Sequence, residues 1–314
     1  MPEPRVLVCG SLAIDTIMVF PDRFARHILP DRTHMLSVAF QIGEMRREWG
    51  GCAGNIAYNL KGIGGEPVVM GTLGDDGGEY LERLKTLAIA GEGVRMVPGT
   101  YTAQAFIITD LDDNQITAFH PGAMNESHRN AVTDVRGIAL GIVAPDGREG
   151  MRAHLAQFAN AGIPVLFDPG QGLPLFSGDE LVEMIELADY LAMNDYEGKL
   201  LSDKTGLTLE AISKRVDALV VTRGAEGSRI HVDGTVIDIP AVRPTALVDP
   251  TGCGDAYRAG LLYGIAQGWD WQRTGRLASA LGSLKIAARG GQNHALSRDA
   301  VASLYAKAFG ETPF

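Results

Sequence analysis

A short run near the C-terminal end of the chain has the residue types and spacing that phosphoryl transfer needs. Asp249–Ala256 reads Asp-Pro-Thr-Gly-Cys-Gly-Asp-Ala and lies between a strand-like stretch, Val242–Val248, and a helix-like stretch, Ala256–Gln267. Backbone N–H groups at the start of a helix have no partner within it, and the helix dipole favours an anion in front of them. Glycine also lets an oxyanion come close to the backbone. The sequence therefore predicts an anion hole built from the amides of Gly252, Cys253 and Gly254.

Asp255 places a carboxylate in the first turn of the same helix, next to the predicted anion. This arrangement is electrostatically unfavourable unless the carboxylate has a chemical task, and accepting a proton from an attacking hydroxyl is such a task. We therefore expect Asp255 to be a catalytic base. The alternative is a glycine-rich strand–helix turn capped by acids, but the strand–turn–helix context favours a phosphate site.

Two further motifs have the chemistry to bind a hydroxyl-rich acceptor. Asp15 follows the first predicted strand and could bind two vicinal hydroxyls, or it could be a solvated loop acid. Gly50–Asn55 precedes a helix, and the Asn55 amide offers both a donor and an acceptor. A tight turn capped by asparagine is the alternative for this second motif.

Two motifs later in the chain have the chemistry to bind a nucleotide. Asn194 and Glu197 follow a predicted strand and could orient Mg²⁺-bound waters and phosphate, since Mg²⁺ keeps most of its waters in proteins. Thr222–Gly227 follows the next strand and could hold nucleotide phosphates. All these motifs fall at predicted strand ends, where open α/β sheets bind ligands, so the sequence indicates one shared crevice and an enzyme.

The composition limits the class of protein. The chain has 314 residues, enough for one large α/β domain, and a net charge of −10, which disfavours nucleic acid and anionic membranes as partners. Three cysteines far apart in the sequence indicate a reducing compartment, so we expect a cytoplasmic protein. The apolar N-terminal stretch is interrupted by Gly10, Ser11 and Asp15, which is typical of a buried strand rather than of a signal peptide. No apolar run reaches the length of a membrane span, and the GxxxxGK(S/T) phosphate loop is absent.

Short apolar runs alternate with amphipathic stretches, and this pattern predicts an α/β fold with a mostly parallel central sheet and helices on both faces. The predicted strands are Val6–Cys9, Val68–Met70, Ile138–Val143, Pro164–Phe167, Tyr190–Met193 and Leu219–Thr222. The predicted helices are Asn55–Ile63, Glu79–Ala90, Arg148–Ala161, Asp179–Ala188, Tyr196–Ser202, Leu209–Val216, Asp255–Gln267, Trp271–Ala288 and Arg298–Phe309.

Two segments break this alternation. Thr16–Trp49 is rich in charge, and Tyr101–Phe119 has the pattern of a hairpin with its turn at Asp112-Asp113-Asn114. We expect residues 16–49 and 101–119 to form one small β-sheet lid over a large domain of residues 1–15, 50–100 and 120–314. A second hairpin, over residues 228–239, should lie at an edge of the main sheet near the nucleotide.

Taken together, four of the motifs resemble those of the ribokinase-like (PfkB) carbohydrate and nucleoside kinase family, and the resemblance spans essentially the whole chain. Asp249–Asp255 is similar to the family signature D-(T/P)-(T/N)-G-A-G-D, Gly50–Asn55 to GG-x-x-x-N, Asn194–Glu197 to N-x-x-E and Thr222–Gly227 to T-x-G-x-x-G. The resemblance implies ATP and Mg²⁺ as cofactors and Asp255 as the catalytic base.

The resemblance also implies roles for single residues. It assigns acceptor binding to Ser11, Asp15, Gly51 and Asn55, and ATP binding to Asn194, Thr222, Gly224, Gly227 and Ser279. Glu197 would hold Mg²⁺ through water. Asp249 and the loop Arg289–Asn293 occupy the place where many members bind a monovalent cation such as K⁺. Cys253 stands where the family usually has alanine, and Ser279 where many members have asparagine near the adenine.

The glycine-rich runs are most similar to those of bacterial nucleoside kinases of the adenosine kinase type. Gln171 could pair with the edge of a purine. No cluster of basic residues accompanies Asp15 or Gly50–Asn55, which argues against a phosphofructokinase, although Arg46 and Arg47 lie in the lid segment. We therefore expect ATP-dependent phosphorylation of the 5′-hydroxyl of a ribonucleoside, adenosine or another purine nucleoside.

Two other functions stay open at this point. A sugar kinase of the ribokinase type would use the same chemistry in a smaller pocket. A protein that kept the fold but only binds a sugar or nucleoside is the third alternative, and Asp255 with its intact glycines argues against it. The sequence does not decide between a monomer and a homodimer.

Overall fold

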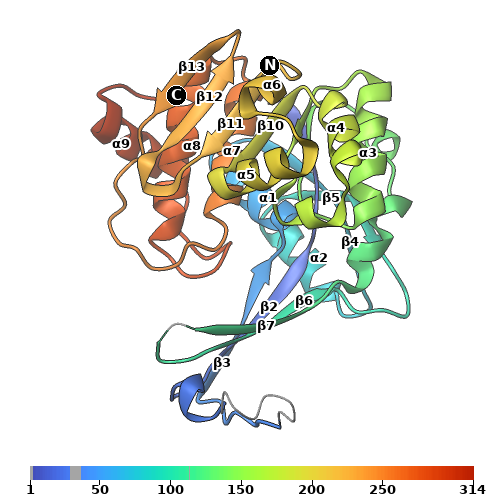
Figure 1. Cartoon of the computed structure of the whole chain (residues 1–314), viewed down its shortest axis with the longest axis vertical. Helices are drawn as coiled ribbons and strands as arrows, with labels where there is room; N and C mark the ends of the chain where they lie inside the picture. The colour runs from blue at the N-terminus through green and yellow to red at the C-terminus, as the bar shows by residue number, and fades with distance from the viewer. Residues whose placement is uncertain (1–2, 29–36, 113) are drawn as a thin grey trace.

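The structure, a computed structural model, describes residues 3–28, 37–112 and 114–314. Its main feature is a nine-stranded sheet with the order β13-β12-β11-β10-β9-β8-β1-β4-β5 (Figure 1). The pairs from β5 to β11 are parallel, and β12 and β13 add an antiparallel hairpin at one edge, as predicted. The strands are β1 Arg5–Cys9, β4 Glu66–Leu73, β5 Ala90–Met96, β8 Ile138–Val143, β9 Val165–Phe167, β10 Tyr190–Asn194, β11 Ala218–Thr222, β12 Ser228–Val232 and β13 Thr235–Ile239.

Helices cover both faces of this sheet, because successive residues of a strand point to opposite faces and both sets are apolar. In β1, Val6 and Val8 join one buried cluster, whereas Leu7 and Cys9 join the other. The first cluster is packed by α1 Cys52–Gly62, α2 Gly78–Thr86, α7 Cys253–Ala266, α8 Trp271–Ile286 and α9 Arg298–Phe309. The second is packed by α3 Arg148–Ala161, α4 Gly178–Glu186, α5 Asp195–Thr205 and α6 Leu209–Ser213. The predicted fold class is confirmed.

A separate four-stranded sheet has the order β3-β2-β6-β7 and extends away from the body of the molecule (Figure 1). Its strands are β2 Ala13–Val19, β3 Glu44–Gly50, β6 Ala103–Thr109 and β7 Gln115–His120. β2 pairs with β3 on one side and with β6 on the other, so the two segments that break the alternation do form one sheet. Residues 29–36 of the first segment and Asp113 of the predicted turn lie outside the described residues. We call this sheet the lid sheet.

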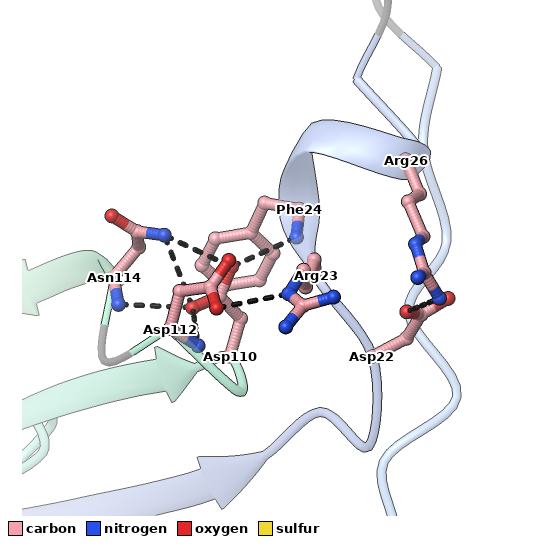
Figure 2. Close-up of polar contacts among 7 residues, drawn as sticks. All are labelled: Asp22, Arg23, Phe24, Arg26, Asp110, Asp112 and Asn114. Atoms are coloured by element: carbon pink, nitrogen blue, oxygen red, sulfur yellow. Dashed lines mark hydrogen bonds and ion pairs between the residues drawn. The ribbon is translucent and has the colours of Figure 1, made fainter.

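A polar cluster fixes the outer end of the lid sheet (Figure 2). The Asp110 carboxylate accepts hydrogen bonds at 2.9 Å from the backbone N–H of Phe24 and from that of Asn114. Burial raises the pKa of Asp110, but these bonds outweigh it and lower the pKa to about 2. Arg23 adds an ion pair with Asp112 at 2.9 Å. The loop that carries Phe24 is thereby attached to the turn between β6 and β7.

The predicted strand over Val242–Val248 is wrong, because this stretch has no regular secondary structure. Pro240, Pro244 and Pro250 fall in or beside it, and proline donates no hydrogen bond to a sheet. The end of α8 holds the stretch instead, since the N–H groups of Val248 and Asp249 donate to Ile286 O at 2.9 and 3.2 Å.

The predicted helix Glu79–Ala90 is too long. It ends at Thr86, and the edge strand β5, Ala90–Met96, follows within a few residues. Two glycines and two charged residues give β5 no clear apolar alternation, and an edge strand needs little of it. Across residues 3–28, 37–112 and 114–314, no helix combines the length and the apolar character needed to cross a membrane.

Candidate active site

The glycine-rich run begins helix α7, as predicted. Gly252 is the N-cap residue with φ at +77°, a conformation that strains any side chain. A Cβ atom at this position would also lie 3.1 Å from the Cα of Gly291. The backbone N–H of Cys253 donates to Pro250 O at 3.1 Å, so this amide belongs to a turn and would have to leave Pro250 to bind an anion.

Asp255 lies in the first turn of α7 and meets Asn55 of α1. The Asn55 Nδ2 donates to the Asp255 Oδ2 at 2.8 Å. Burial, with the negative charge of Asp168, raises the pKa of Asp255 to about 7, although Asn55 and Arg258 act to lower it. A carboxyl group with a pKa near neutrality suits a general base, because it is partly ionised at neutral pH and still accepts a proton readily.

The orientation of the Asn55 amide is fixed from its other end. Its Oδ1 accepts from Gln292 Nε2 at 3.2 Å, and the same Nε2 donates to Tyr80 Oη at 2.9 Å. Tyr80 Oη in turn donates to Gly50 O at 2.7 Å. These contacts turn the NH₂ group of Asn55 toward Asp255. Asn55 therefore holds the carboxylate in place, in addition to the acceptor contact that the sequence predicts.

Ser11 and Gly51 join the end of β1 to the start of α1. The Ser11 Oγ accepts from the backbone N–H of Cys52 at 3.1 Å. Gly51 has φ at +85°, and a Cβ atom there would lie 2.4 Å from Ser11 O, so only glycine fits. Both residues build the backbone around Asn55, and their predicted contact with an acceptor stays a prediction.

Asp15 lies within β2 of the lid sheet and not in a loop at the edge of the main sheet, which corrects the sequence-based placement. The reason is that β1 ends at Cys9 and β2 already begins at Ala13, so Asp15 falls within the second strand. The pKa of Asp15 is raised to about 6, mainly by burial and further by the negative charges of Glu48 and Asp249. Asp15 thus reaches the site from the lid side.

The strand pairing shows which residues share the face of Asp15. Opposite Asp15 stand Glu48 in β3 and Ala105 in β6, and Ala105 stands opposite Phe119 in β7. Residues directly opposite one another project from the same face of a sheet. Phe119 is 53% exposed on that face. Arg46, two residues before Glu48, projects from the same face and has Glu48 as an ion-pair partner at 3.3 Å.

A buried ion pair between Arg258 and Asp168 lies close to Asp255, and it was not predicted from the sequence. Arg258, one turn further along α7, donates from Nε and Nη2 to Asp168 at 3.0 and 3.3 Å. Its Nη2 also lies 4.0 Å from Glu197 Oε2. The sequence does contain a signal for Arg258: it is the sole charged residue in the otherwise apolar run Ala256–Ala266.

Asn194 and Glu197 form the N-terminal cap of α5. The Asn194 Oδ1 accepts from the Glu197 N–H at 2.7 Å, and the Glu197 Oε2 accepts from the Asn194 N–H at 2.7 Å. Burial and the charge of Asp168 raise the pKa of Glu197. Among the described residues, no group of three or more His, Cys, Asp or Glu is arranged to hold a metal ion. A Mg²⁺ ion bound through waters needs no such group, so Glu197 fits the water-mediated contact that the sequence predicts.

Most of the remaining residues that are predicted to bind the nucleotide follow β11, at the carboxyl end of the main sheet. Thr222 ends β11, next to β10 with Asn194, and Gly224 and Gly227 have φ at +54° and +83° in the following turn. Ser279 of α8 is buried, where its Oγ donates to Pro240 O at 2.9 Å and accepts from Val242 N at 3.0 Å. Ser279 thus fixes the loop after β13. Gln171 is exposed in a 3₁₀ turn, Gly170–Leu175, after β9.

Comparison with known proteins gives this geometry a family. Residues 10–298 match the pfkB family carbohydrate kinase. The chain belongs to the pfkB family. It is 52% identical to the nucleoside kinase of Burkholderia thailandensis, whose structure in complex with inosine covers 98% of this chain and 99% of that one with a TM-score of 0.89. The same Burkholderia enzyme has also been solved with ADP and inosine, at a TM-score of 0.87 and 53% identity over 98% of this chain and 97% of that chain.

Two further relatives are less similar to this chain. The nucleoside kinase of Methanocaldococcus jannaschii is 33% identical over 84% of this chain and 88% of its own length. The ribokinase of Lactococcus lactis is 32% identical over 72% of this chain and 76% of its own length. The predicted family is therefore confirmed, and the relatives include both of the acceptor classes that the sequence leaves open.

Proposed function

We propose that the protein transfers the γ-phosphoryl group of ATP to the 5′-hydroxyl of a purine ribonucleoside, with adenosine and inosine as acceptors. The observation that carries the proposal is the hydrogen bond from Asn55 of α1 to Asp255 in the first turn of α7, with Asp15 on the lid sheet as a second carboxyl group. The pKa of Asp255 is raised to about 7 and that of Asp15 to about 6. The Burkholderia relative, which binds inosine, supports a nucleoside as the acceptor.

The two carboxyl groups would divide the work on the acceptor. Asp15 would accept hydrogen bonds from the 2′- and 3′-hydroxyls of ribose, which leaves the 5′-hydroxyl at the other end of the sugar to face Asp255. Phe119 lies two strands away from Asp15 on the same face, on the order of 10 Å. This spacing suits a base attached to that ribose, so we propose Phe119 as the surface on which the purine stacks, with Gln171 at its polar edge.

ATP would lie along the strand ends of β10 and β11. Thr222, Gly224 and Gly227 would surround its phosphates, and Ser279 would act on the adenine through the loop that it fixes. Glu197 would orient waters on Mg²⁺, which when bound neutralises charge on the transferred phosphate. The amides at the start of α7 would donate hydrogen bonds to the oxygens of the γ-phosphoryl group, and Asp255 would take the proton of the attacking hydroxyl.

The lid sheet would exclude water from the reacting phosphate. Hydrogen exchange should slow in residues 13–19, 44–50 and 103–120 when adenosine is added, even without ATP. Protection confined to residues 194–227 would mean that adenosine occupies the ATP-binding side of the site.

The reducing compartment inferred from the three cysteines, all free in the structure, agrees with a cytoplasmic enzyme.

One assay tests the proposal: release of ADP in the presence of ATP and Mg²⁺ with adenosine, inosine, guanosine, ribose or fructose 6-phosphate. Stimulation by the purine nucleosides and not by the sugars is expected. Stimulation by ribose alone would make the protein a sugar kinase of the ribokinase type. If none of the five acceptors stimulates ADP release while a nucleoside still binds, the protein is a binding protein and the proposal fails.

A further inference from the structure

A buried lysine lies directly beneath the anion hole. Lys285, in the last turn of α8, has no exposed surface. Its Nζ donates to Asp249 O at 3.0 Å and to Ala288 O at 2.9 Å. Lysine normally keeps its ammonium in water, because burying a charge is unfavourable unless polar partners replace the water. The two carbonyl groups are such partners, and the position of this charge needs an explanation beyond the capping of α8.

The ammonium group connects the segment before the anion hole to the loop after α8. A Cβ atom on Gly252 would lie 3.6 Å from the Lys285 Cε, so the lysine stem passes next to the N-cap of α7. The Asp249 carboxylate completes the connection, since its oxygens accept from Thr251 N and Gly290 N, both at 2.8 Å. Lys285 and Asp249 therefore fix the two ends of the turn that presents the 252–254 amides.

The loop that Lys285 anchors also contacts both carboxyl-bearing parts of the site. Gln292 donates to Asn55, the residue that holds Asp255. Asn293 donates to Glu48, the neighbour of Asp15 in the lid sheet. A shift of this loop would therefore change the anion hole, the base and the lid contact together.

These contacts disagree with the expectation of a monovalent cation between Asp249 and the loop Arg289–Asn293. Such a cation is held by carbonyl and carboxylate oxygens. Here the carbonyl oxygens of Asp249 and Ala288 accept from a covalently attached ammonium, and both carboxylate oxygens of Asp249 accept from the backbone. The donor set does not fit an additional cation that needs these oxygens.

We propose that Lys285 is a positioning residue that takes the place of a dissociable monovalent cation, so that phosphoryl transfer by this chain is independent of K⁺. The inference rests on the proposed phosphoryl transfer. A fixed positive charge below the N-terminus of α7 acts in the same direction as the helix dipole and favours an anion in the hole. Because the charge is tethered, no ion has to bind before catalysis.

The test replaces K⁺ by tetramethylammonium at constant ionic strength, with adenosine, inosine and ATP as substrates. Wild-type turnover and melting temperature should not change. Lys285→Met should lower kcat on the order of 10²-fold, because the loop that Lys285 anchors presents the anion hole and holds Asn55. The KM for the nucleoside should change less, because the loop contacts the lid sheet at Glu48, the neighbour of Asp15. Lys285→Ala, which opens a space lined by two carbonyl groups, should regain turnover with K⁺ or methylammonium, and its melting temperature should rise with K⁺.

Lys204→Met is the matched control. Lys204 also lies in the last turn of a helix and donates to a backbone carbonyl, Phe176 O, but at the end of α5 remote from Asn194. This variant should keep its kcat and should not respond to K⁺.

A wild-type enzyme that loses turnover when K⁺ is removed overturns the inference, and this result needs no variant to fold. Equal loss in Lys285→Met and Lys204→Met, or a Lys285→Ala variant that folds but is neither rescued nor stabilised by K⁺, overturns it as well. Failure of the proposed function would look different, because the wild-type protein would then phosphorylate no nucleoside in any salt.

Discussion

The anion-hole end of α7 and the lid sheet carry the two carboxyl groups of the proposed site, and they are built in opposite ways. Asp255 is enclosed by side chains from α1, from α7 and from the loops near Asp168 and Gln292. Asp15 instead lies on the lid sheet, and the face that it shares with Phe119 is open, with Phe119 more than half exposed. Burial raises the pKa of both carboxyl groups, so the difference lies in their surroundings. The proposed base is held by fixed side chains, whereas the proposed acceptor contact lies on a surface that can open to admit the acceptor.

The largest effect on turnover should come from a change at the start of α7. Asp255→Asn keeps the shape and the contact with Asn55 but removes the base, and kcat should fall by about 10²–10⁴-fold. ATP binding, measured by calorimetry, should persist. Turnover near that of the wild-type protein would contradict the role of Asp255.

The same variant should change stability in a pH-dependent way. The folded pKa of Asp255, about 7, lies above its ordinary value of 3.8, so the wild-type protein loses stability as the pH rises between these values. Asparagine has no proton to lose, so the melting temperature of the Asp255→Asn variant relative to wild type should rise with pH between 3.8 and about 7 and level off above that. A constant difference would mean that burial does not shift this pKa.

On the lid side, Asp15→Ala should act on the acceptor alone. Each hydrogen bond from a ribose hydroxyl to a carboxylate contributes about 1.5–3 kcal/mol, so the KM for the nucleoside should rise strongly and that for ATP little. The matched substrates are 2′-deoxy- and 3′-deoxyadenosine, for which the loss should be smaller. An equal loss with all three nucleosides would show that Asp15 does not contact these hydroxyls.

Two phenylalanines on opposite faces of the lid sheet separate base stacking from general packing. Phe119→Ala should raise the KM for adenosine by roughly 10-fold, since stacking of a base on an aromatic ring is worth about 1–3 kcal/mol. Phe106 stands in the next row and projects from the other face at 40% exposure, so Phe106→Ala is the control and should bind adenosine normally. If the two variants behave alike, the purine does not stack on this face.

The contact between α1 and α7 should tune the pH dependence of catalysis. Activity should rise with pH through about 7 as Asp255 loses its proton. Asn55→Ala removes a hydrogen bond that lowers this pKa, so the acidic limb of kcat/KM should move to higher pH by about one unit. A limb that stays in place would mean that another group controls it.

The smallest effect on turnover is expected at the outer end of the lid sheet. Asp110→Ala removes the acceptor for Phe24 and Asn114 (Figure 2), so hydrogen exchange in residues 22–27 should speed up while kcat stays unchanged. Asp112→Ala, which breaks only an exposed ion pair with Arg23, should do much less. A marked loss of kcat in Asp110→Ala would show that the end of the lid acts on the chemistry.

The central sheet could be predicted because its strands are apolar on both faces, a pattern that few other folds produce. The start of α7 could be predicted because glycines before an apolar helix have a narrow range of structural uses. The stretch before α7 was predicted wrongly because three prolines in and around an apolar run remove the donors that a strand needs. The edge strand β5 was missed because it is only partly buried.

By itself, the sequence identified the side chains and turns of the proposed site: the glycines before α7, Asp255, Asn55, Asp15 and the motifs after β10 and β11. Tertiary structure alone decided what surrounds them. Asn55 and Asp255 are 200 positions apart and yet hydrogen-bonded, Asp15 enters from the lid sheet, and Lys285 and Arg258 are buried charges beside the site. The physical reason is that residue type and local spacing fix the chemistry of a side chain, whereas its pKa, orientation and charge partners depend on which distant segments exclude water from it.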